Sequence, residues 1–367
     1  MNPFGLYIHW PWCLSKCAYC DFNSRPLANI DEKQWLAAYL ADIGHLAGLM
    51  PGRTVSSVFF GGGTPSLMPP AVLDGILAAI AGHWALADDR EISLEANPGA
   101  TGNFPAITRA GINRLSLGIQ SLDDTHLNFL GRRHSAREGL EALEEARKDF
   151  SRVSADFITA LPGQSLAMWE KELSAILALG LSHLSIYQLT LEAGTRLAAL
   201  NPAMPDEDKA AANYELTAKM TGEAGLCAYE VSNHAKPGEE CRHNLLYWRY
   251  GDYGGIGPGA HGRLTLPGGK LATTFPAGAE AWMKKAGAPD TETLDARAQT
   301  TEMLLMGLRL AEGVNLARLA ALGWPDVATN SRIQSLMEQG FLERTDSHLR
   351  TTPAGRLRLN GVIERLA

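Results

Sequence analysis

The chain has 367 residues, of which 46% are hydrophobic and 20% are charged, and its formal net charge is −7. This composition is that of a globular protein with room for one large α/β domain and a smaller second domain. A negative balance of charge argues against non-specific nucleic-acid binding, which requires a basic surface.

A cysteine-rich loop follows the first predicted strand, at residues 6–10. Cys13, Cys17 and Cys20 have the spacing C-x3-C-x2-C, and the two other cysteines lie far away in the sequence. Three thiolates in one short loop can hold three irons of a 4Fe–4S cluster and leave the fourth iron open to a ligand. A structural zinc site is the alternative, although such a site normally has four ligands, arranged as two Cys pairs.

The cysteine usage also indicates a compartment. An iron–sulfur cluster needs reduced thiols, and five cysteines with three in one loop do not resemble a disulfide framework. The first residues lack a basic segment and a cleavage site, and no apolar run reaches the ~20 residues of a membrane span. We expect a cytoplasmic protein without a transmembrane segment, and peripheral contact with the inner face of the membrane is left open.

Strands and helices alternate along the next two hundred residues. The predicted strands cover residues 55–60, 91–98, 112–120, 153–160 and 183–190, and the predicted helices cover residues 31–49, 70–85, 135–150, 166–179 and 207–225. This alternation predicts parallel strands joined by right-handed crossovers. Six such units, with polar residues at the strand ends, favour a partial (β/α)6 barrel over an open Rossmann sheet, and no G-x-G-x-x-G follows the first strand.

The chain is predicted to divide into three parts. Residues 1–262 form the α/β partial barrel with a glycine-rich extension, residues 263–290 form a linker rich in Pro, Gly and Ala, and residues 291–367 form a small, mainly helical domain with a hairpin arm at 349–353. This last part carries nine Arg, no Lys and nine Asp or Glu, so it lacks the basic excess of a DNA-binding winged helix. We expect a lid or docking domain.

Polar residues at the predicted strand ends indicate a binding site. The run Gly-Gly-Gly-Thr-Pro at residues 61–65 lets a ligand approach the backbone, and its amides can donate to a carboxylate, although such a turn is often only structural. Glu95 lies on a strand otherwise fit for burial, where it would meet a ligand's amine or a structural partner such as Arg114. Gln120 and Asp156 would point toward the barrel mouth.

The cysteine spacing, with an aromatic residue just before the last Cys, resembles that of the radical-SAM family. The likeness extends over nearly the whole chain to the HemN/HemW branch of that family, through Glu-Ala-Asn-Pro at 95–98, Ser-Leu-Gly-Ile-Gln-Ser at 116–121 and Gly-Arg at 131–132. The resemblance implies a 4Fe–4S cluster whose open iron binds the amino and carboxylate groups of S-adenosylmethionine (SAM). It also implies a SAM site made of Tyr7, Tyr19, Gly62, Gly63, Thr64, Glu95, Gln120, Arg132 and Asp156.

Two departures from the coproporphyrinogen III oxidases of this branch favour its haem-chaperone subgroup. The oxidase pattern has a further Cys two positions after the third, where this chain has Phe22. The oxidases also have a substantial segment before the first strand, which here starts almost at Met1. The alternative is radical decarboxylation of coproporphyrinogen propionates to vinyl groups, and a zinc-stabilised binding protein comes third. Whether the chain is an enzyme is left open.

The motif His-Asn-Leu-Leu-Tyr-Trp at residues 243–248 resembles the haem-binding signature of the chaperones. Neutral imidazole is a good axial ligand of haem iron. In a helix His243 and Tyr247 would share a face, as would Asn244 and Trp248. The alternative is an aromatic packing patch around a histidine with satisfied hydrogen bonds. No C-x-x-C-H is present, so covalent haem attachment has no support.

The resemblance also implies partners for the chain. These are haem itself, a haem donor protein, recipient haemoproteins of the respiratory chain, and a second copy of the chain in a homodimer. Arg242 or Arg249 is expected to pair with the haem propionates. Cys227 and Cys241 are expected to be structural, and no nucleic acid is expected among the partners.

Overall fold

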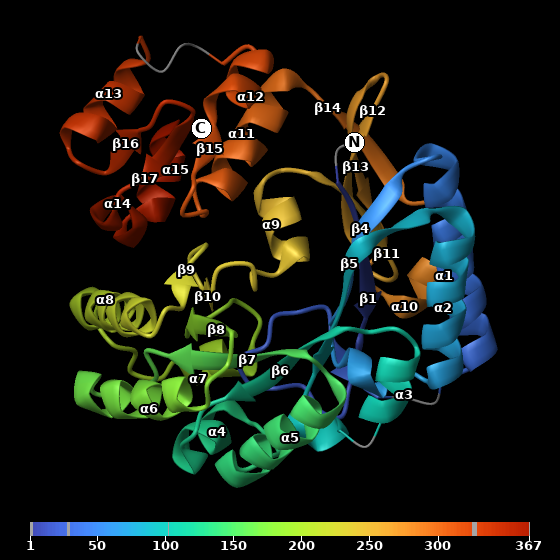
Figure 1. Ribbon diagram of the computed structural model, residues 1–367, viewed down its shortest axis with the longest axis horizontal. Helices are drawn as coiled ribbons and strands as arrows, with labels where there is room; N and C mark the ends of the chain where they lie inside the picture. Colours follow the sequence, from blue (N-terminus) through green and yellow to red (C-terminus); the bar gives the residue numbers. More distant parts are fainter. Residues whose placement is uncertain (1–2, 28–29, 102, 325–328, 367) are drawn as a thin grey trace.

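The computed structural model describes residues 3–27, 30–101, 103–324 and 329–366. Its largest feature is a curved twelve-stranded sheet with the strand order β14-β13-β12-β11-β1-β4-β5-β6-β7-β8-β10-β9. Most helices cover the outer side of this sheet, whereas α9 (Arg242–Trp248) packs on the other side against β1, β4 and β11 (Figure 1).

Six parallel strands form the predicted part of the sheet. They are β1 (Phe4–Trp10), β4 (Thr54–Gly62), β5 (Ala85–Ala96), β6 (Arg114–Gln120), β7 (Arg152–Thr159) and β8 (His183–Gln188). Each strand pairs in parallel with the next one in chain order. Within the described residues β8 does not return to β1, so the barrel is open. The expected partial (β/α)6 barrel is confirmed.

Five connecting helices begin within one residue of where the sequence predicts them, and three shorter helices between them were not predicted. Asp31 caps α1 through the backbone N–H groups of Lys33 and Gln34, and Ser135 and Glu138 form a capping box at the start of α5. The helices of this part are α1 (Glu32–Leu49), α2 (Pro70–His83), α3 (Phe104–Arg109), α4 (Asp124–Leu130), α5 (Ala136–Asp149), α6 (Leu166–Ala178), α7 (Arg196–Leu200) and α8 (Glu207–Glu223), with 3-10 turns η1 (Pro65–Leu67) and η2 (Pro98–Ala100).

Strand β1 separates the hydrophobic core from the interior of the barrel. Its even-numbered residues, including Leu6 and Ile8, have no exposed surface and pack into the core beneath the outer helices. Because side chains alternate along a strand, Tyr7 and His9 face the opposite side. Both line a cavity inside the barrel. One short strand therefore carries both a core face and a site face.

The region expected to be a linker is instead part of the sheet. β11 (Asp252–Ile256) pairs in parallel with β1, and β12 (His261–Leu266), β13 (Gly269–Thr274) and β14 (Asp290–Leu294) continue the sheet as antiparallel strands. Helix α10 (Ala279–Lys284) lies between the last two strands in sequence. The prediction of a linker at 263–290 is therefore wrong. Antiparallel strands with one exposed face need few apolar residues, so the Gly, Pro and Ala content concealed them.

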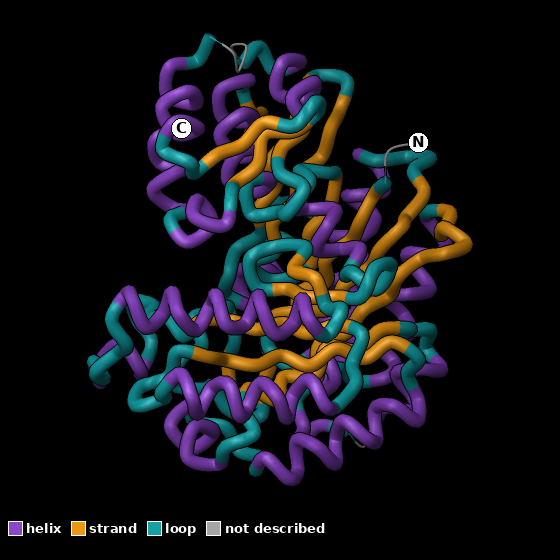
Figure 2. The backbone as a smooth tube through the Cα atoms, turned by 60° about the vertical axis from the view of Figure 1, so that its left-hand side comes forward, coloured by secondary structure: helices purple, strands orange, loops and turns teal. Residues whose placement is uncertain are grey.

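The C-terminal residues form a mainly helical unit beside the barrel, as predicted (Figure 2). It contains α11 (Ala296–Gly307), α12 (Leu316–Ala321), α13 (Ser331–Glu338), α14 (Pro353–Leu357), α15 (Leu359–Leu366) and a small sheet of β15 (Val314–Asn315), β17 (His348–Thr351) and β16 (Leu342–Arg344). The predicted hairpin arm corresponds to β16 and β17. Leu304, Leu336 and Leu349 belong to a separate hydrophobic core. An ion pair of 2.7 Å between Glu302 of this unit and Arg263 of the large sheet joins the two parts.

Two further short strands, β9 (Cys227–Ala228) and β10 (Asn233–Ala235), finish the other end of the large sheet as an antiparallel extension of β8. None of the helices in the described ranges is both long and apolar enough to cross a lipid bilayer.

Candidate functional site

The cysteine loop is fastened at its base and at its tip. At the base, β2 (Trp12–Cys13) pairs with β3 (Arg25–Pro26), and the N–H of Leu27 donates to the carbonyl of Cys13 at 2.7 Å. At the tip, the N–H of Ala18 donates to the carbonyl of Leu130, and its own carbonyl accepts from the N–H of Leu197. The loop is thereby held over the carboxyl ends of the barrel strands.

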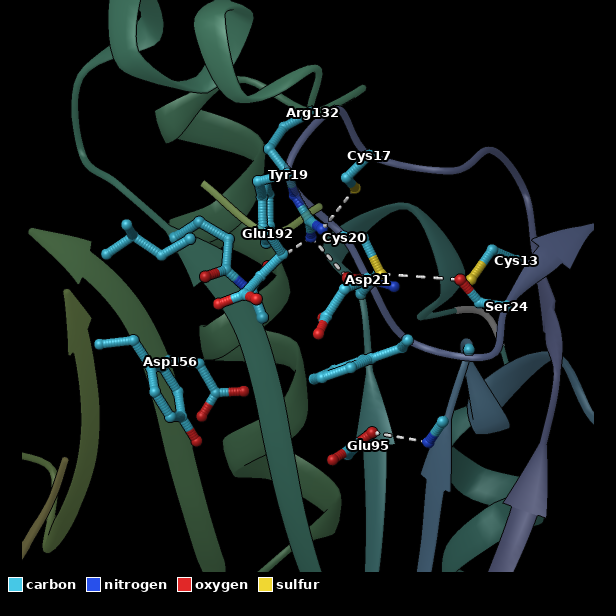
Figure 3. Close-up of a pocket in the computed structure, with 18 of the residues that line it drawn as sticks. Cys13, Cys17, Tyr19, Cys20, Asp21, Ser24, Glu95, Arg132, Asp156 and Glu192 are labelled. Carbon is cyan, nitrogen blue, oxygen red and sulfur yellow. Dashed lines mark hydrogen bonds between the residues drawn. The ribbon is translucent and has the colours of Figure 1, made fainter. Parts of the chain in front are cut away.

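Cys13, Cys17 and Cys20 line one cavity of about 310 Å³, together with residues from the ends of β4, β5, β6, β7 and β8 (Figure 3). We call it the cysteine cavity. In the part of the chain that the structure describes, no three His, Cys, Asp or Glu side chains are arranged to ligate a single metal ion.

The surroundings of the three thiols suit a cationic centre. Burial raises the pKa of Cys13 and of Cys20, and the neighbouring cysteines raise both further by mutual repulsion. The Arg132 Nη1 donates to Cys17 Sγ at 3.3 Å, and Ser24 Oγ lies 3.6 Å from Cys20 Sγ. Thiolates that repel one another in a buried loop are stabilised by metal ligation. The donor set and its burial therefore fit an iron–sulfur cluster.

The backbone N–H groups of the glycine run at residues 61–65 have different partners from those expected. Gly62 has a φ of +109°, and a Cβ there would lie 2.5 Å from the His9 ring, so only glycine fits. The N–H of Gly62 donates to Glu95 Oε2 at 3.2 Å, that of Gly63 to the carbonyl of Trp10, and that of Thr64 to the carbonyl of Trp12. The expectation that these amides await a ligand's carboxylate is therefore wrong. The run serves to dock the loop against β1.

Two carboxylates stand in the barrel interior, Glu95 on β5 and Asp156 on β7 (Figure 3). Burial first, and Asp156 second, raise the pKa of Glu95 to about 8. Burial also raises the pKa of Asp156, whose Oδ1 accepts from Ser116 Oγ at 3.0 Å. Within the described residues no ion pair joins either carboxylate to Arg114, whose Nη2 donates to Ser154 Oγ. The interior therefore holds two carboxylates that lack a direct cationic partner.

Most of the residues predicted for SAM come together in the cysteine cavity. Tyr19, Gly62, Gly63, Glu95, Gln120, Arg132 and Asp156 line it. Gln120 has a φ of +75°, a left-handed conformation that is costly for a residue with a side chain and is often found at functional sites. Thr64 does not line this cavity, because its Oγ1 accepts from Asn97 Nδ2 at 2.7 Å behind the loop. Tyr7 lines a neighbouring cavity.

Asn97, Tyr187 and Glu192 are among the residues that line the cysteine cavity but were not predicted. Asn97 links the loop to the barrel, since its Oδ1 accepts from Arg132 Nη2 and its Nδ2 donates to Thr64. Tyr187 and Glu192 come from the end of β8 and the loop after it. Their position at the end of a predicted strand was the available signal, because ligands in such barrels bind at the carboxyl ends of the strands.

A second cavity of about 530 Å³ lies inside the barrel, and we call it the histidine cavity. It is lined by His243, Asn244 and Tyr247 from α9, together with Tyr7, His9, Phe59, Glu95, Arg114, Asp156, Tyr187, Tyr253 and Met306. His243 and Tyr247 share a helix face, with ring centroids 5.9 Å apart, as predicted. Trp248 is not among the residues that line this cavity. Its ring packs on Tyr247 and lies beneath the guanidinium of Arg309.

His243 is held as a neutral, buried imidazole. Its ring stacks with Phe59 and with Tyr7, at centroid distances of 5.3 and 6.2 Å, and its Nδ1 lies 3.3 Å from Ser57 Oγ. Burial lowers the pKa of His243 to about 4, so the ring is uncharged near neutral pH. For Nε2 the described structure records no hydrogen bond. A neutral imidazole with one nitrogen engaged and the other available is suited to ligate a metal.

The two arginines expected to meet propionates have other partners. Arg242 pairs with Asp89 at 2.6 Å, and Arg249 pairs with Glu312 at 2.7 Å, both away from the histidine cavity. That expectation is therefore wrong for both residues. Cys241 is buried with its Sγ 3.4 Å from Glu91 Oε1, which agrees with a structural role, whereas Cys227 is exposed.

Glu91 holds the start of α9 in place. It is only 1% exposed, its Oε1 accepts from the N–H of Arg242 at 3.0 Å, and its Oε2 accepts from Arg152 Nη1 at 2.8 Å. Arg114 and Arg152 together keep the pKa of this carboxyl low in spite of burial, which opposes them. A carboxylate on β5 therefore fixes the helix that carries His243.

We expect Glu91→Ala to lower the free energy of unfolding by about 3–5 kcal/mol, because it leaves Arg152 and the first N–H groups of α9 without their buried acceptor. Urea unfolding followed by circular dichroism would measure the loss. Asp89→Asn is the matched control on the same strand, since its ion pair is at the surface, and its unfolding midpoint should remain that of the wild type. A Glu91→Ala protein as stable as the control would contradict this role.

Comparison with known proteins gives the same picture for the whole chain. The family model of the radical SAM superfamily matches residues 7–176, and that of the HemN C-terminal domain matches residues 294–358. The fold is similar to that of coproporphyrinogen III oxidase (HemN) from Escherichia coli, with a TM-score of 0.82 and 19% identity over 99% of this chain and 90% of that one.

Similar sequences cover almost the full length as well. The chain is 35% identical to the Heme chaperone HemW of Escherichia coli, over 99% of this chain and 98% of the relative. It is 38% identical to the Heme chaperone HemW of Mycobacterium tuberculosis, over 100% and 95% of the two chains. It is 39% identical to the mitochondrial Radical S-adenosyl methionine domain-containing protein 1 of Bos taurus, over 92% and 81%.

Proposed function

We propose that this chain, which belongs to the HemW family of the radical SAM superfamily, binds haem and passes it to haem-requiring respiratory proteins. The observation that carries the proposal is His243. Its imidazole is neutral, its Nδ1 is engaged by Ser57, and it lines an aromatic cavity of about 530 Å³. Imidazole is a usual axial ligand of haem iron, and flat aromatic side chains pack well on a porphyrin.

The same proposal assigns the haem contacts. His243 would ligate the iron, and Asn244 and Tyr247 would contact the porphyrin from the same helix. Trp248 would contribute indirectly, by holding Tyr247 in place, since their ring centroids are 4.7 Å apart. With Arg242 and Arg249 engaged elsewhere, Arg114 is the buried cation that lines this cavity among the described residues.

We further propose that Cys13, Cys17 and Cys20 hold a 4Fe–4S cluster, which supplies an open iron that can bind SAM and an electron to reduce it. The chain's own contributions support this assignment. Arg132 touches Cys17, Tyr19 and Gln120 line the same cavity, and Gly62 and Gly63 dock the loop against β1. Thr64 and Tyr7 would act from behind, through Asn97 and His9 respectively.

The expected setting of this function is the cytoplasm, with a haem donor, recipient haemoproteins and a homodimer as the proposed partners. Size-exclusion chromatography with light scattering, before and after cluster reconstitution, would report the oligomeric state.

The test uses anaerobically reconstituted protein. Titration with haem should give a saturable Soret band, and mixing with an apo-haemoprotein should move the band to the acceptor. Coproporphyrinogen III with SAM and a strong reductant should give no product. Multiple turnovers to protoporphyrinogen without saturable haem binding would replace the chaperone with the oxidase, which is the second candidate function.

Replacement of Glu95 by Gln should weaken SAM binding about tenfold or more. The change keeps the shape of the side chain but removes the negative charge that would accept a hydrogen bond from the amino group of SAM, and a charge-assisted hydrogen bond contributes about 1.5–3 kcal/mol. Equilibrium dialysis with labelled SAM would measure the affinity. A matching loss in cluster content would contradict the assignment, since Glu95 does not touch the cysteines in the described hydrogen-bond network.

The wild-type protein provides its own control through pH. Because the pKa of Glu95 is about 8, this carboxyl is mostly protonated at lower pH, and SAM binding must remove its proton. SAM affinity should therefore rise more steeply from about pH 6 to about pH 7.5 in the wild type than in Glu95→Gln, where only the amino group of SAM still has to lose a proton to bind the iron. Equal pH profiles for the two proteins would place Glu95 in a structural role.

A further inference from the structure

The cysteine cavity and the histidine cavity share one wall. Phe22, Gly62, Glu95, Asp156 and Tyr187 line both of them. Under the proposed function one cavity takes SAM and the other takes haem. The two ligands would therefore contact the same side chains from opposite sides, and neither could bind without changing the surroundings of the other.

Tyr7 and His9 brace this shared wall from β1. The Tyr7 ring stacks on His243, and its hydroxyl lies 3.0 Å from His9 Nδ1, while His9 Nε2 lies 2.9 Å from the carbonyl of Asn23 in the cysteine loop. The Asn23 Nδ2 in turn donates to the carbonyls of Pro258 and Ala277. A chain of direct contacts thus joins the end of the cysteine loop to the imidazole of His243.

Above the pKa of Glu95, about 8, the wall is charged, and its charge has one sign. Glu95 and Asp156 are its two ionisable carboxyls, and each repels the other. Arg114 lines only the histidine cavity. Glu91 and Cys241, which do not line this cavity, lie near the Arg114 guanidinium. His9, His243 and His261 complete the titratable lining of that cavity apart from its tyrosines, and burial lowers the pKa of all three, so they add no positive charge.

We infer that SAM and haem bind to this chain with positive coupling, carried by Glu95 and Asp156 in the shared wall. The inference rests on the proposed function. SAM carries a sulfonium cation, whereas haem bears two propionates. In a low-dielectric interior the two carboxylates oppose the anionic ligand, and a cation on their other side offsets that opposition. Linkage then requires haem to strengthen SAM binding by the same factor.

The experiment is a haem titration of the reconstituted protein at about pH 9, where both carboxyls of the wall are ionised. It is followed by the Soret band without SAM, with saturating SAM, and with S-adenosylhomocysteine. SAM should lower the Kd of haem about fivefold or more. S-adenosylhomocysteine lacks the sulfonium charge, so it should lower the Kd less. The reciprocal measurement, SAM dialysis with and without haem, should give the same factor as the Soret titration.

Two variants locate the coupling. Asp156→Asn removes one carboxylate of the shared wall, so haem should bind it more tightly than the wild type when SAM is absent, and added SAM should have a smaller effect. Glu192→Gln is the matched control, because Glu192 lines the cysteine cavity but not the histidine cavity. It should keep the wild-type coupling factor.

Each other outcome has a distinct meaning. Saturable haem binding whose Kd is unchanged or raised by SAM would overturn the coupling and leave the proposed function intact. A coupling factor equal for SAM and S-adenosylhomocysteine, or equal in Asp156→Asn and the wild type, would overturn the electrostatic origin inferred here. Absence of a saturable Soret band in every titration would overturn the proposed function, and the coupling with it.

Discussion

Cys17→Ala protein should carry almost no iron or sulfide after anaerobic reconstitution, where the wild type should carry about four of each per chain. Cys17 is one of three thiols in a loop that offers no fourth cysteine, and its sulfur is the one that Arg132 contacts directly. Loss of one of three ligands leaves two irons without a protein ligand. Iron and sulfide assays, together with the broad sulfur-to-iron charge-transfer absorption in the visible range, would measure the loss.

The matched control is Cys227→Ala, which removes an exposed cysteine from β9, far from the loop. It should reconstitute like the wild type. Stoichiometric zinc in place of iron, in protein purified and reconstituted without oxygen, would show that the loop builds a different metal site. Retention of a full cluster by Cys17→Ala would exclude Cys17 as a ligand.

His243→Ala should bind haem more than about tenfold more weakly than the wild type and should lose the Soret position of a histidine-ligated haem. The imidazole is the one side chain of α9 that offers an uncharged nitrogen donor to the cavity. Because the pKa of His243 is about 4, its protonation should not weaken haem binding between about pH 5 and about pH 8. Added imidazole should restore the Soret band if the cavity itself is intact.

His234→Ala is the control for the loss of a buried histidine. His234 is 2% exposed, its pKa is likewise lowered to about 4 by burial, and its Nδ1 lies 3.0 Å from Thr221 Oγ1, but it does not line the histidine cavity. It should bind haem like the wild type. Both variants should keep their cluster. Equal haem affinity in His243→Ala and the wild type would remove His243 from the site.

The alternation of strands and helices made the barrel predictable. Each of the six parallel strands contains a short buried run, and β6, β7 and β8 end in the polar residues Gln120, Thr159 and Gln188. The runs are largely apolar because they are buried on both faces. The cysteine loop was equally clear, because the spacing of its thiols is local. Features of this kind depend on residues that are close together in the sequence, so they can be predicted from one sequence alone.

The strands β11 to β14 could not be predicted in the same way. β11 contains two adjacent glycines, and its pairing with β1 is decided by packing: a Cβ at Gly254 would lie 2.2 Å from Leu46, and one at Gly255 would lie 2.1 Å from the carbonyl of His261. Tight contact between distant segments requires glycine there, which lowers strand propensity. The same holds for the amides of Gly62 and Gly63, whose acceptors, Glu95 and Trp10, lie on β5 and β1.

The pairing of β1 also constrains the order in which the sheet can form during synthesis. One edge of β1 pairs with β4, but the other pairs with β11, with Phe4 opposite Asp252. During synthesis that second edge stays open until almost the whole sheet has been translated, since contacts so far apart in sequence form late. Asn23, at the end of the cysteine loop, can make its hydrogen bonds only after the same part of the chain has been translated, because it donates to the carbonyls of Pro258 and Ala277. On the ribosome the three thiols would therefore remain accessible long after they emerge, which gives iron–sulfur assembly factors time to act before the barrel closes over them.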